Sequence, residues 1–159
     1  MKNKSVQSKE DSQSNLQSDV AGFSILLIED DNTLAELWHS YLETQGHQVD
    51  CCDTVADATV LLHSNHYDLL IVDIFLRQDG QILAEGGVTI INRVRLNSGF
   101  NSNSTEHLAI LAVTGADTRS QGKFSALNSV TNLIDASLQK PIKLETLGRE
   151  VHRLCTANE

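Results

Sequence analysis

The chain has 159 residues, of which 12 are Lys or Arg and 21 are Asp or Glu, so its formal net charge is −9. This balance argues against a protein that binds duplex nucleic acid, because such proteins need clustered cations opposite the phosphates. Hydrophobic residues make up 40% of the chain, which is enough for a core, but no apolar run approaches the roughly 20 residues that span a bilayer. We therefore expect a cytoplasmic protein of ordinary domain size.

Residues 1–23 differ in composition from the rest of the chain. Serine, glutamine and asparagine alternate there with charged residues, and almost no apolar side chain is present. A stretch of this kind cannot bury enough surface to offset the entropy lost on ordering it. We therefore predict a disordered polar tail over 1–23 and a folded domain over 24–159.

Beyond the tail, short apolar runs alternate with segments of helical periodicity. Such runs are typical of strands buried on both faces, and apolar residues three and four apart are typical of helices packed on a sheet. The pattern predicts strands at about 25–28, 47–52, 69–72, 108–113 and 134–138. Helices are predicted at about 33–45, 54–64, 87–96 and 144–154, and a weaker helix is predicted somewhere within 121–130. Five strands alternating with five helices indicate an α/β fold with a parallel sheet covered on both faces.

Polar residues end four of the predicted strands. Glu29 and Asp30 follow the first strand, and Asp73 follows the third. Thr114 follows the fourth strand and Lys140 the fifth. The carboxyl ends of parallel strands share one crevice, where carboxylates this close repel one another unless a cation neutralises them. Carboxylate oxygens suit Mg²⁺, and a carboxylate beside Mg²⁺ can act as a nucleophile on phosphorus while a hydroxyl and an ammonium stabilise the transferring group.

Four segments carry a resemblance to a known family, and they occur in that family's order. They are ILLIEDDN at 25–32, YDLLIVDIFL at 67–76, AVTGA at 112–116 and LQKP at 138–141. Each motif alone is weak, but all four stand at the ends of predicted strands, namely the first, third, fourth and fifth. The chain from about 24 to 154 resembles the receiver domain of bacterial two-component response regulators. The resemblance implies a flavodoxin-like fold, with five parallel strands in the order 2-1-3-4-5.

The resemblance also implies a phosphoacceptor and a metal site. Asp73 matches the aspartate that accepts the phosphoryl group in this family. Asp30 would bind Mg²⁺ (or Mn²⁺) directly, together with Asp73, and Glu29 would act through a bound water. The backbone carbonyl of Phe75, two residues past the acceptor, would complete the protein's share of the metal shell.

Thr114 and Lys140 match the two further catalytic positions of the family, where they would contact the transferred phosphoryl group. The donor would be a sensor histidine kinase or a histidine phosphotransfer protein. A downstream effector protein would recognise the phosphorylated form, and a homodimer is a further candidate assembly. We expect no direct DNA binding, no membrane contact and no enzymatic activity beyond the domain's own phosphoryl transfer and slow dephosphorylation. This expectation assumes a stand-alone regulator, since the segment after Leu154 is too short for an output domain.

The chain departs from the family pattern at several positions. Arg77 stands where the family usually has a proline, and the loop at 77–86 is several residues longer than usual. Ser137 replaces the Tyr or Phe that often precedes the lysine by three residues. Phe75 and Ala116 occupy the positions that tune dephosphorylation, and neither side chain can orient an attacking water. We therefore expect slow self-dephosphorylation.

Two alternatives to a stand-alone regulator stay open from the sequence. A degenerate receiver that binds its partner regardless of phosphate is favoured by Arg77, by the long loop and by Ser137. A receiver fragment of a longer response regulator would carry the same motifs. A phosphohydrolase of the haloacid dehalogenase type also uses an aspartyl nucleophile, but it needs a second aspartate two residues later, where this chain has Phe75.

Other polar and aromatic residues are given structural interpretations. Asp31, Asn32 or Thr33 can cap the first helix, and for Asp31 the role of a cap is favoured over that of a metal ligand. Trp38 has the spacing of a core residue in that helix. Arg93 and Arg95 are interpreted as a solvated face of the third helix.

Overall fold

The computed structural model describes residues 22–78, 81–82, 86–96, 108–115 and 121–157. Within this part of the chain, five strands form one parallel sheet in the order β2-β1-β3-β6-β7. Numbered along the chain, the strands of this sheet therefore lie in the order 2-1-3-4-5. The predicted flavodoxin-like architecture is confirmed.

Strands and helices alternate along the described chain, close to the predicted ranges. The strands of the sheet are β1 (Ser24–Ile28), β2 (Gln48–Cys52), β3 (Leu69–Asp73), β6 (Ala109–Thr114) and β7 (Ala136–Gln139). The helices are α1 (Asn32–Thr44), α2 (Val55–Ser64), α3 (Gly86–Arg95), α4 (Gln121–Val130) and α5 (Leu144–Thr156). Every predicted helix and strand is present, and the signal was strongest for β1, β3 and β6, which are almost entirely apolar and buried.

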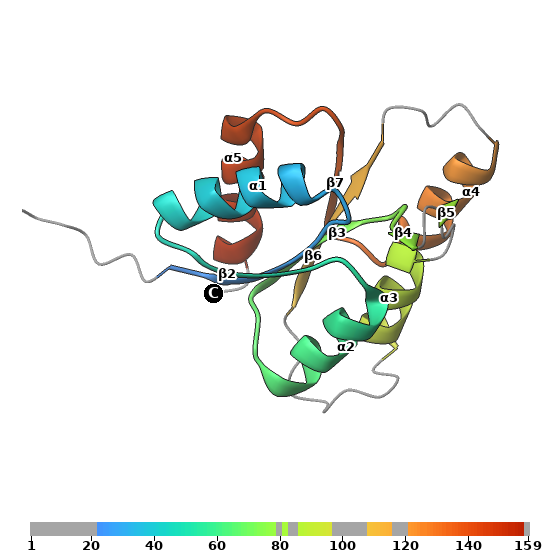
Figure 1. Cartoon of the computed structure of the whole chain (residues 1–159), viewed down its shortest axis with the longest axis horizontal. Coiled ribbons are helices and arrows are strands. Elements are labelled where there is room, and N and C mark those ends of the chain that lie inside the picture. Colours follow the sequence, from blue (N-terminus) through green and yellow to red (C-terminus); the bar gives the residue numbers. More distant parts are fainter. Residues whose placement is uncertain (1–21, 79–80, 83–85, 97–107, 116–120, 158–159) are drawn as a thin grey trace, which may run out of the picture.

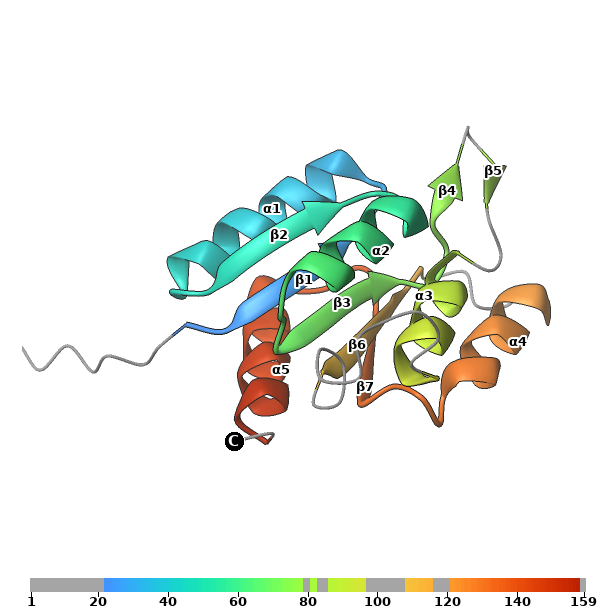
Figure 2. The same cartoon turned by 90° about the horizontal axis from the view of Figure 1, so that it is seen from below.

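The helices form a layer on each face of the sheet. In Figure 1, α1 and α5 lie above the sheet, and α2 and α3 lie below it. Figure 2 looks at the sheet from below, with α4 beside α3 at the side of β7. Buried residues of α1 and α5 form one core cluster, and those of α2, α3 and α4 form the other. The five helices therefore bury both faces, as parallel sheets require.

Successive side chains of β1 pack alternately in the two core clusters. Ile25 and Leu27 pack on the side of α1 and α5, whereas Leu26 and Ile28 pack on the side of α2, α3 and α4. All four side chains are at most 1% exposed. The predicted core position of Trp38 is confirmed, since this residue of α1 is 1% exposed. The two-sided burial explains why the strand reads as a continuous apolar run and does not alternate.

Helix α1 begins beside the carboxyl end of β1. The Asp31 carboxylate accepts a hydrogen bond from the backbone N–H of Leu34 at 3.1 Å, so the predicted N-cap is confirmed. The chain leaves the helix through Gly46, whose φ of 91° lies in the left-handed region that glycine adopts without a steric penalty.

Two boundaries differ from the sequence prediction. The segment interpreted as a loop contains a short antiparallel pair, β4 (Arg77–Gln78) with β5 (Gln81–Ile82). Phe23, assigned to the tail, is 8% exposed and packs in the core of α1 and α5, so ordered packing begins before Ser24. Residues 1–21 of the predicted tail lie outside the described residues. No helix in the described ranges is long and apolar enough to cross a bilayer.

The interpretation of Arg95 as a solvated residue is wrong. Its guanidinium donates to the carbonyls of Leu133 (2.6 Å) and Leu108 (2.9 Å) and to Oδ2 of Asp135 (2.6 Å). The same oxygen of Asp135 accepts from the backbone N–H of Ile110 at 2.7 Å. These residues precede or begin β6 and β7, so Arg95 ties the end of α3 to the amino ends of two strands. Helical periodicity places Arg95 beside the core. It does not indicate that backbone carbonyls lie within hydrogen-bond reach of the guanidinium.

Candidate functional site

Three carboxylates meet at the carboxyl ends of β1 and β3. Glu29 and Asp30 directly follow β1, and Asp73 is the last residue of β3. One oxygen of each lies within 4.8 Å of the other two, and this is the only group of three or more His, Cys, Asp or Glu ligands found among the described residues. Glu29 is 2% exposed and Asp73 is 6% exposed. The parallel topology thus brings together the carboxylates that the sequence predicted would meet.

Lys140 places an ammonium group between two of these carboxylates. Its Nζ donates a hydrogen bond to Oδ2 of Asp73 at 2.6 Å and lies 2.6 Å from Oε2 of Glu29. The backbone N–H of Lys140 donates to the carbonyl of Thr114 at 2.8 Å, which fixes the end of β7 beside β6. Burial lowers the pKa of Lys140, but the hydrogen bonds and charges of Asp73 and Glu29 outweigh it and the pKa is raised. Lys140 is therefore a permanent cation at neutral pH.

Glu29 is the most deeply buried carboxylate of the site. Burial raises its pKa, and the charge of Asp73 acts in the same direction, against the opposing effects of Lys140 and of a backbone N–H. That N–H belongs to Asp31 and donates to Oε1 at 3.2 Å. The contact of Oε2 with Lys140 lacks hydrogen-bond angles, and no other donor among the described residues reaches this buried oxygen. A buried carboxylate oxygen whose one cationic neighbour in the described part of the chain is the Lys140 ammonium keeps lone pairs that a hard divalent cation can take.

Two backbone contacts hold the segment that follows β3. Oδ1 of Asp73 accepts a hydrogen bond from the backbone N–H of Phe75 at 2.8 Å. On the other side, the N–H of Gly87 donates to the carbonyl of Ile74 at 3.3 Å. A Cβ atom at Gly87 would lie 2.1 Å from the backbone oxygen of Asp73, so only glycine allows α3 to pack this close. The two contacts fix the orientation of the Asp73 carboxylate.

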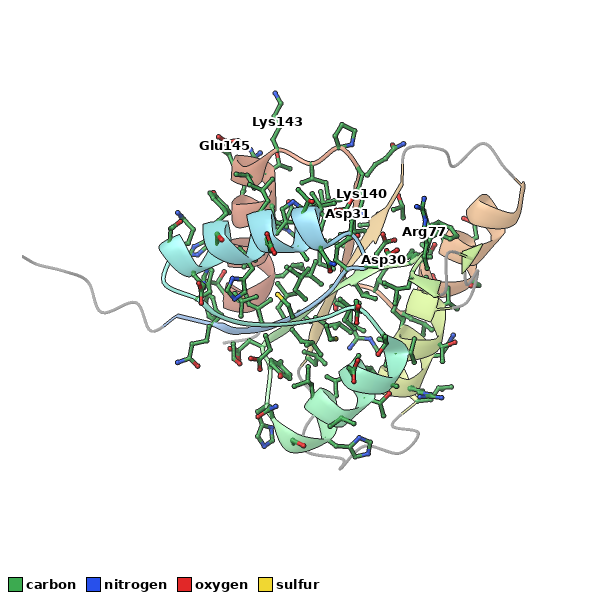
Figure 3. All side chains as sticks on the ribbon, viewed as in Figure 1. Asp30, Asp31, Arg77, Lys140, Lys143 and Glu145 are labelled. Carbon is green, nitrogen blue, oxygen red and sulfur yellow. The ribbon has the colours of Figure 1, made fainter. Side chains whose placement is uncertain are left out.

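A cavity of about 410 Å³ opens over these groups. Figure 3 shows Asp30, Asp31, Arg77 and Lys140 gathered at this edge of the sheet, whereas Lys143 at the start of α5 points away from it. The residues that line the cavity come from four segments of the chain. They are Glu29, Asp30, Asp31, Asp73, Phe75, Arg77, Gly115 and Lys140. The cavity is open to solvent and carries four carboxylates against two cations.

The other positions that the sequence analysis singled out lie in different environments. Thr114 ends β6 and is 3% exposed, and it is Gly115, the next residue, that lines the cavity. Phe75 lines the cavity and is 9% exposed. Ser137 is an exposed residue of β7, and Ala116 lies outside the described residues. The site thus contains the predicted acids and lysine in direct contact, with the threonine at the adjacent strand end.

Two features of the site escaped the sequence analysis. Arg77 was noted only as a replacement for proline, yet it lines the cavity and its backbone N–H donates to Oδ2 of Asp30 at 3.2 Å. Trp38 was interpreted as a packing residue, yet Nζ of Lys140 lies 5.8 Å from the centre of its ring. The position of Arg77 four residues after Asp73 was visible in the sequence, but its contact with Asp30 depends on how the chain turns after β3.

The chain matches the family model described as response regulator receiver domain over residues 25–152. It is 30% identical over 135 residues to the transcriptional regulatory protein PmrA of Pectobacterium parmentieri, which covers 85% of this chain. The chain spans about half, 53%, of the length of that curated relative.

Solved structures share the fold. A sensor protein from Polaromonas is 28% identical with a TM-score of 0.66, and the alignment covers 86% of this chain and 98% of that one. The receiver domain of a sensor histidine kinase from Pseudomonas aeruginosa, 21% identical with a TM-score of 0.68, covers 86% of this chain and 99% of its own. That structure holds a magnesium ion coordinated in its active-site cleft. With the family model matching most of its length, this chain belongs to the response regulator receiver domains of two-component signal transduction.

Proposed function

We propose that this receiver domain accepts a phosphoryl group on Asp73 in a reaction that requires Mg²⁺ (or Mn²⁺). The donor is a sensor histidine kinase or a histidine phosphotransfer protein, and the phosphorylated domain signals through contact with an effector protein. The observation that carries the proposal is the position of Asp73, which is hydrogen-bonded to Lys140 at 2.6 Å in a solvent-open cavity shared with Glu29 and Asp30.

The residues present fit a divalent cation. Asp30 and Asp73 are proposed as direct ligands, Glu29 as a ligand through water, and the Phe75 carbonyl as a further oxygen donor. The fit is supported by the three clustered carboxylates and by the buried Oε2 of Glu29, which lacks a hydrogen-bond donor among the described residues. A bound Mg²⁺ supplies positive charge that offsets the repulsion among the carboxylates and draws charge from the phosphoryl oxygens. The magnesium ion in the Pseudomonas receiver domain supports this assignment.

In the proposed transfer, a carboxylate oxygen of Asp73 forms a bond to phosphorus as the phosphorus–nitrogen bond of a phosphohistidine breaks. The electron pair of the broken bond stays on the imidazole nitrogen, and the product is an aspartyl phosphate. Lys140, kept protonated by its raised pKa, provides a cation for the phosphoryl oxygens. Thr114, at the neighbouring strand end, is proposed to donate its hydroxyl hydrogen to another phosphoryl oxygen.

The same site is proposed to hold the phosphoryl group for a long time. Phe75 lines the cavity with a side chain that has no polar atom to orient an attacking water. The domain thus catalyses its own phosphorylation and slow dephosphorylation and no reaction on another substrate. Because the signal is read as a change of surface, output passes through a partner protein or through a homodimer, without DNA or membrane contact by this domain.

The experiment is intact-mass measurement after incubation with Mg²⁺ and a small phosphodonor such as acetyl phosphate. The wild-type protein is expected to gain one phosphoryl group, and the gain is expected to disappear with a chelator. Asp73→Asn should gain none, whereas Asp53→Asn, an exposed aspartate outside the cavity, should behave like the wild type. An adduct on Asp73→Asn would show that another residue is the acceptor.

A degenerate receiver would give a different result. It would gain no phosphoryl group, and Mg²⁺ would leave the fluorescence of Trp38 unchanged. This outcome would replace the proposal with a module that binds its partner regardless of phosphate. The contact between Lys140 and Asp73 favours a receiver that is phosphorylated, because a binding module has no need of a half-buried lysine paired with a buried aspartate.

A further inference from the structure

Arg77 is the first residue of β4, four residues after Asp73, and it lines the cavity. It is exposed, and Figure 3 shows it beside Asp30, at the edge of the sheet that also carries Lys140. The side chain is one of the two cations among the lining residues. Arg77 thus lies in the segment that follows Asp73, at the side of the cavity that is open to solvent.

The backbone of Arg77 anchors the residue to the site. Its N–H donates to Oδ2 of Asp30 at 3.2 Å, and this bond links the segment after β3 to the segment after β1. A proline at this position would have no N–H and would lose the link. The root of the arginine side chain is thus held next to Asp30, a proposed metal ligand.

The two cations of the cavity differ in what they contact. The ammonium of Lys140 is within 2.6 Å of both Asp73 and Glu29. The guanidinium of Arg77 makes no hydrogen bond or ion pair with any residue in the described ranges, where only the backbone N–H of this residue has a partner. Its donors are therefore available to a group that enters the cavity from solvent.

A phosphodonor brings negative charge toward four carboxylates. Glu29, Asp30, Asp31 and Asp73 all line the cavity, so the approach of a phosphoryl dianion is opposed by their field. A guanidinium presents a planar fork of N–H donors that pairs with two phosphate oxygens at once. A free arginine at the rim of an acidic cleft therefore suits an incoming phosphoryl group better than it suits any other ligand of this reaction.

We propose that the guanidinium of Arg77 binds the phosphoryl group of the incoming donor and thereby sets the affinity of the site for phosphodonors. This inference rests on the proposed function of Asp73 as the phosphoacceptor. The contact is made before transfer, while the donor's phosphorus–nitrogen or phosphorus–oxygen bond is intact. Arg77 thus acts on binding of the donor, whereas Lys140 acts at the acceptor.

The test is the initial rate of phosphorylation as a function of acetyl phosphate concentration, at saturating Mg²⁺. Arg77→Ala keeps the backbone N–H to Asp30 and removes the guanidinium. We expect it to raise the half-saturating donor concentration about 10-fold, the loss typical of one charge-assisted contact, with little change in the maximal rate. Arg77→Lys should recover part of the loss, since an ammonium keeps the charge but not the fork.

Lys143→Ala is the matched control for charge. It removes one cation at the start of α5, where the side chain points away from the cavity and makes no capping hydrogen bond. This variant should match the wild type in donor half-saturation, and a change equal to that of Arg77→Ala would overturn the proposal by showing a general charge effect. Mg²⁺ titration followed by Trp38 fluorescence should give equal affinities for the wild type and Arg77→Ala.

The remaining outcomes separate this inference from the proposed function. If the wild type takes up phosphate and Arg77→Ala has the same half-saturation, the inference fails while Asp73 stands as acceptor. If Arg77→Ala weakens Mg²⁺ binding in step with the rate, Arg77 acts through Asp30 and the metal, and the inference fails again. If the wild type takes up no phosphate at all, the proposed function itself fails.

Discussion

The two ends of the central sheet use charged residues in opposite ways. At the amino end, Arg95 donates to two backbone carbonyls and to Asp135, and Asp135 also accepts a backbone N–H. At the carboxyl end, Lys140 contacts Asp73 and Glu29, and all three residues line a cavity that is open to solvent. Both ends contain short ion pairs, but at the amino end the charged groups also bond to the backbone, whereas at the carboxyl end they face a cavity.

This difference separates a structural ion pair from a reactive one. The network of Arg95 and Asp135 bonds to backbone groups at the amino ends of β6 and β7, and it holds α3, β6 and β7 together. A cluster with surplus negative charge is held in place by the fold and is stabilised when a cation binds to it. Two ion pairs of similar length can thus have different roles. What distinguishes them is which other groups the charged side chains contact.

The largest expected effect is on stability, at the amino end. Arg95→Met keeps the length of the aliphatic stem but leaves the carbonyls of Leu108 and Leu133 and the carboxylate of Asp135 without this donor. We expect a loss of about 2–4 kcal/mol in the free energy of unfolding, with phosphorylation of the folded protein unchanged. Urea denaturation followed by circular dichroism measures the loss. Unchanged stability would show that water replaces the guanidinium at no cost.

The second-largest expected effect is on both the stability and the phosphorylation of the protein. It comes from Gly87, near the carboxyl end of the sheet. In Gly87→Ala, the new Cβ atom would lie 2.1 Å from the backbone oxygen of Asp73, so α3 or the segment that follows β3 must move. We expect a loss of about 2 kcal/mol and a slower phosphorylation, because the Asp73 carboxylate is displaced. Both are measured on one preparation, by thermal unfolding and by intact mass.

Gly148→Ala is the matched control, since it also replaces a glycine inside a helix. Its Cβ atom would meet the hydroxyl oxygen of Tyr41 at 2.7 Å, the far end of a side chain that can turn away. This variant is expected to keep wild-type phosphorylation and to lose little or no stability. Equal losses in the two variants would mean that close packing at Gly87 has no special bearing on the acceptor.

The smallest of these effects comes from the metal. At a Mg²⁺ concentration ten times the dissociation constant, the wild type should gain about 1.4 kcal/mol, or roughly 3–5 °C in Tm. Asp30→Asn removes a proposed ligand and one like charge. It should show no such gain, while starting from an equal or higher Tm without Mg²⁺ because the carboxylates repel less. A gain as large as that of the wild type would exclude Asp30 as a ligand.

The fold was predictable because its signals are local and strong. Each buried strand reads as an unbroken apolar run, Asp31 offers a capping side chain, and Gly46 ends the first helix. The hairpin β4–β5 was missed because two strands of two residues leave no periodicity to detect. Arg95 was misjudged because its partners lie 13 to 40 residues away in the chain, which no pattern along one helix reveals.

The sequence predicted which residues form the site better than it predicted the contacts among them. Glu29, Asp30, Asp73 and Lys140 end parallel strands, and topology alone brings such residues to one edge. The unsatisfied oxygen of Glu29 and the amide contact of Arg77 depend on side-chain and loop geometry, which the sequence does not encode in any short motif.

The contact between Lys140 and Asp73 also has a consequence for the timing of synthesis. The two residues are 67 positions apart, and Lys140 follows the last strand of the sheet. A nascent chain that has emerged only through α4 carries the acceptor and its neighbouring acids but not the lysine. The proposed phosphoacceptor site is thus complete only after β7 has docked on β6.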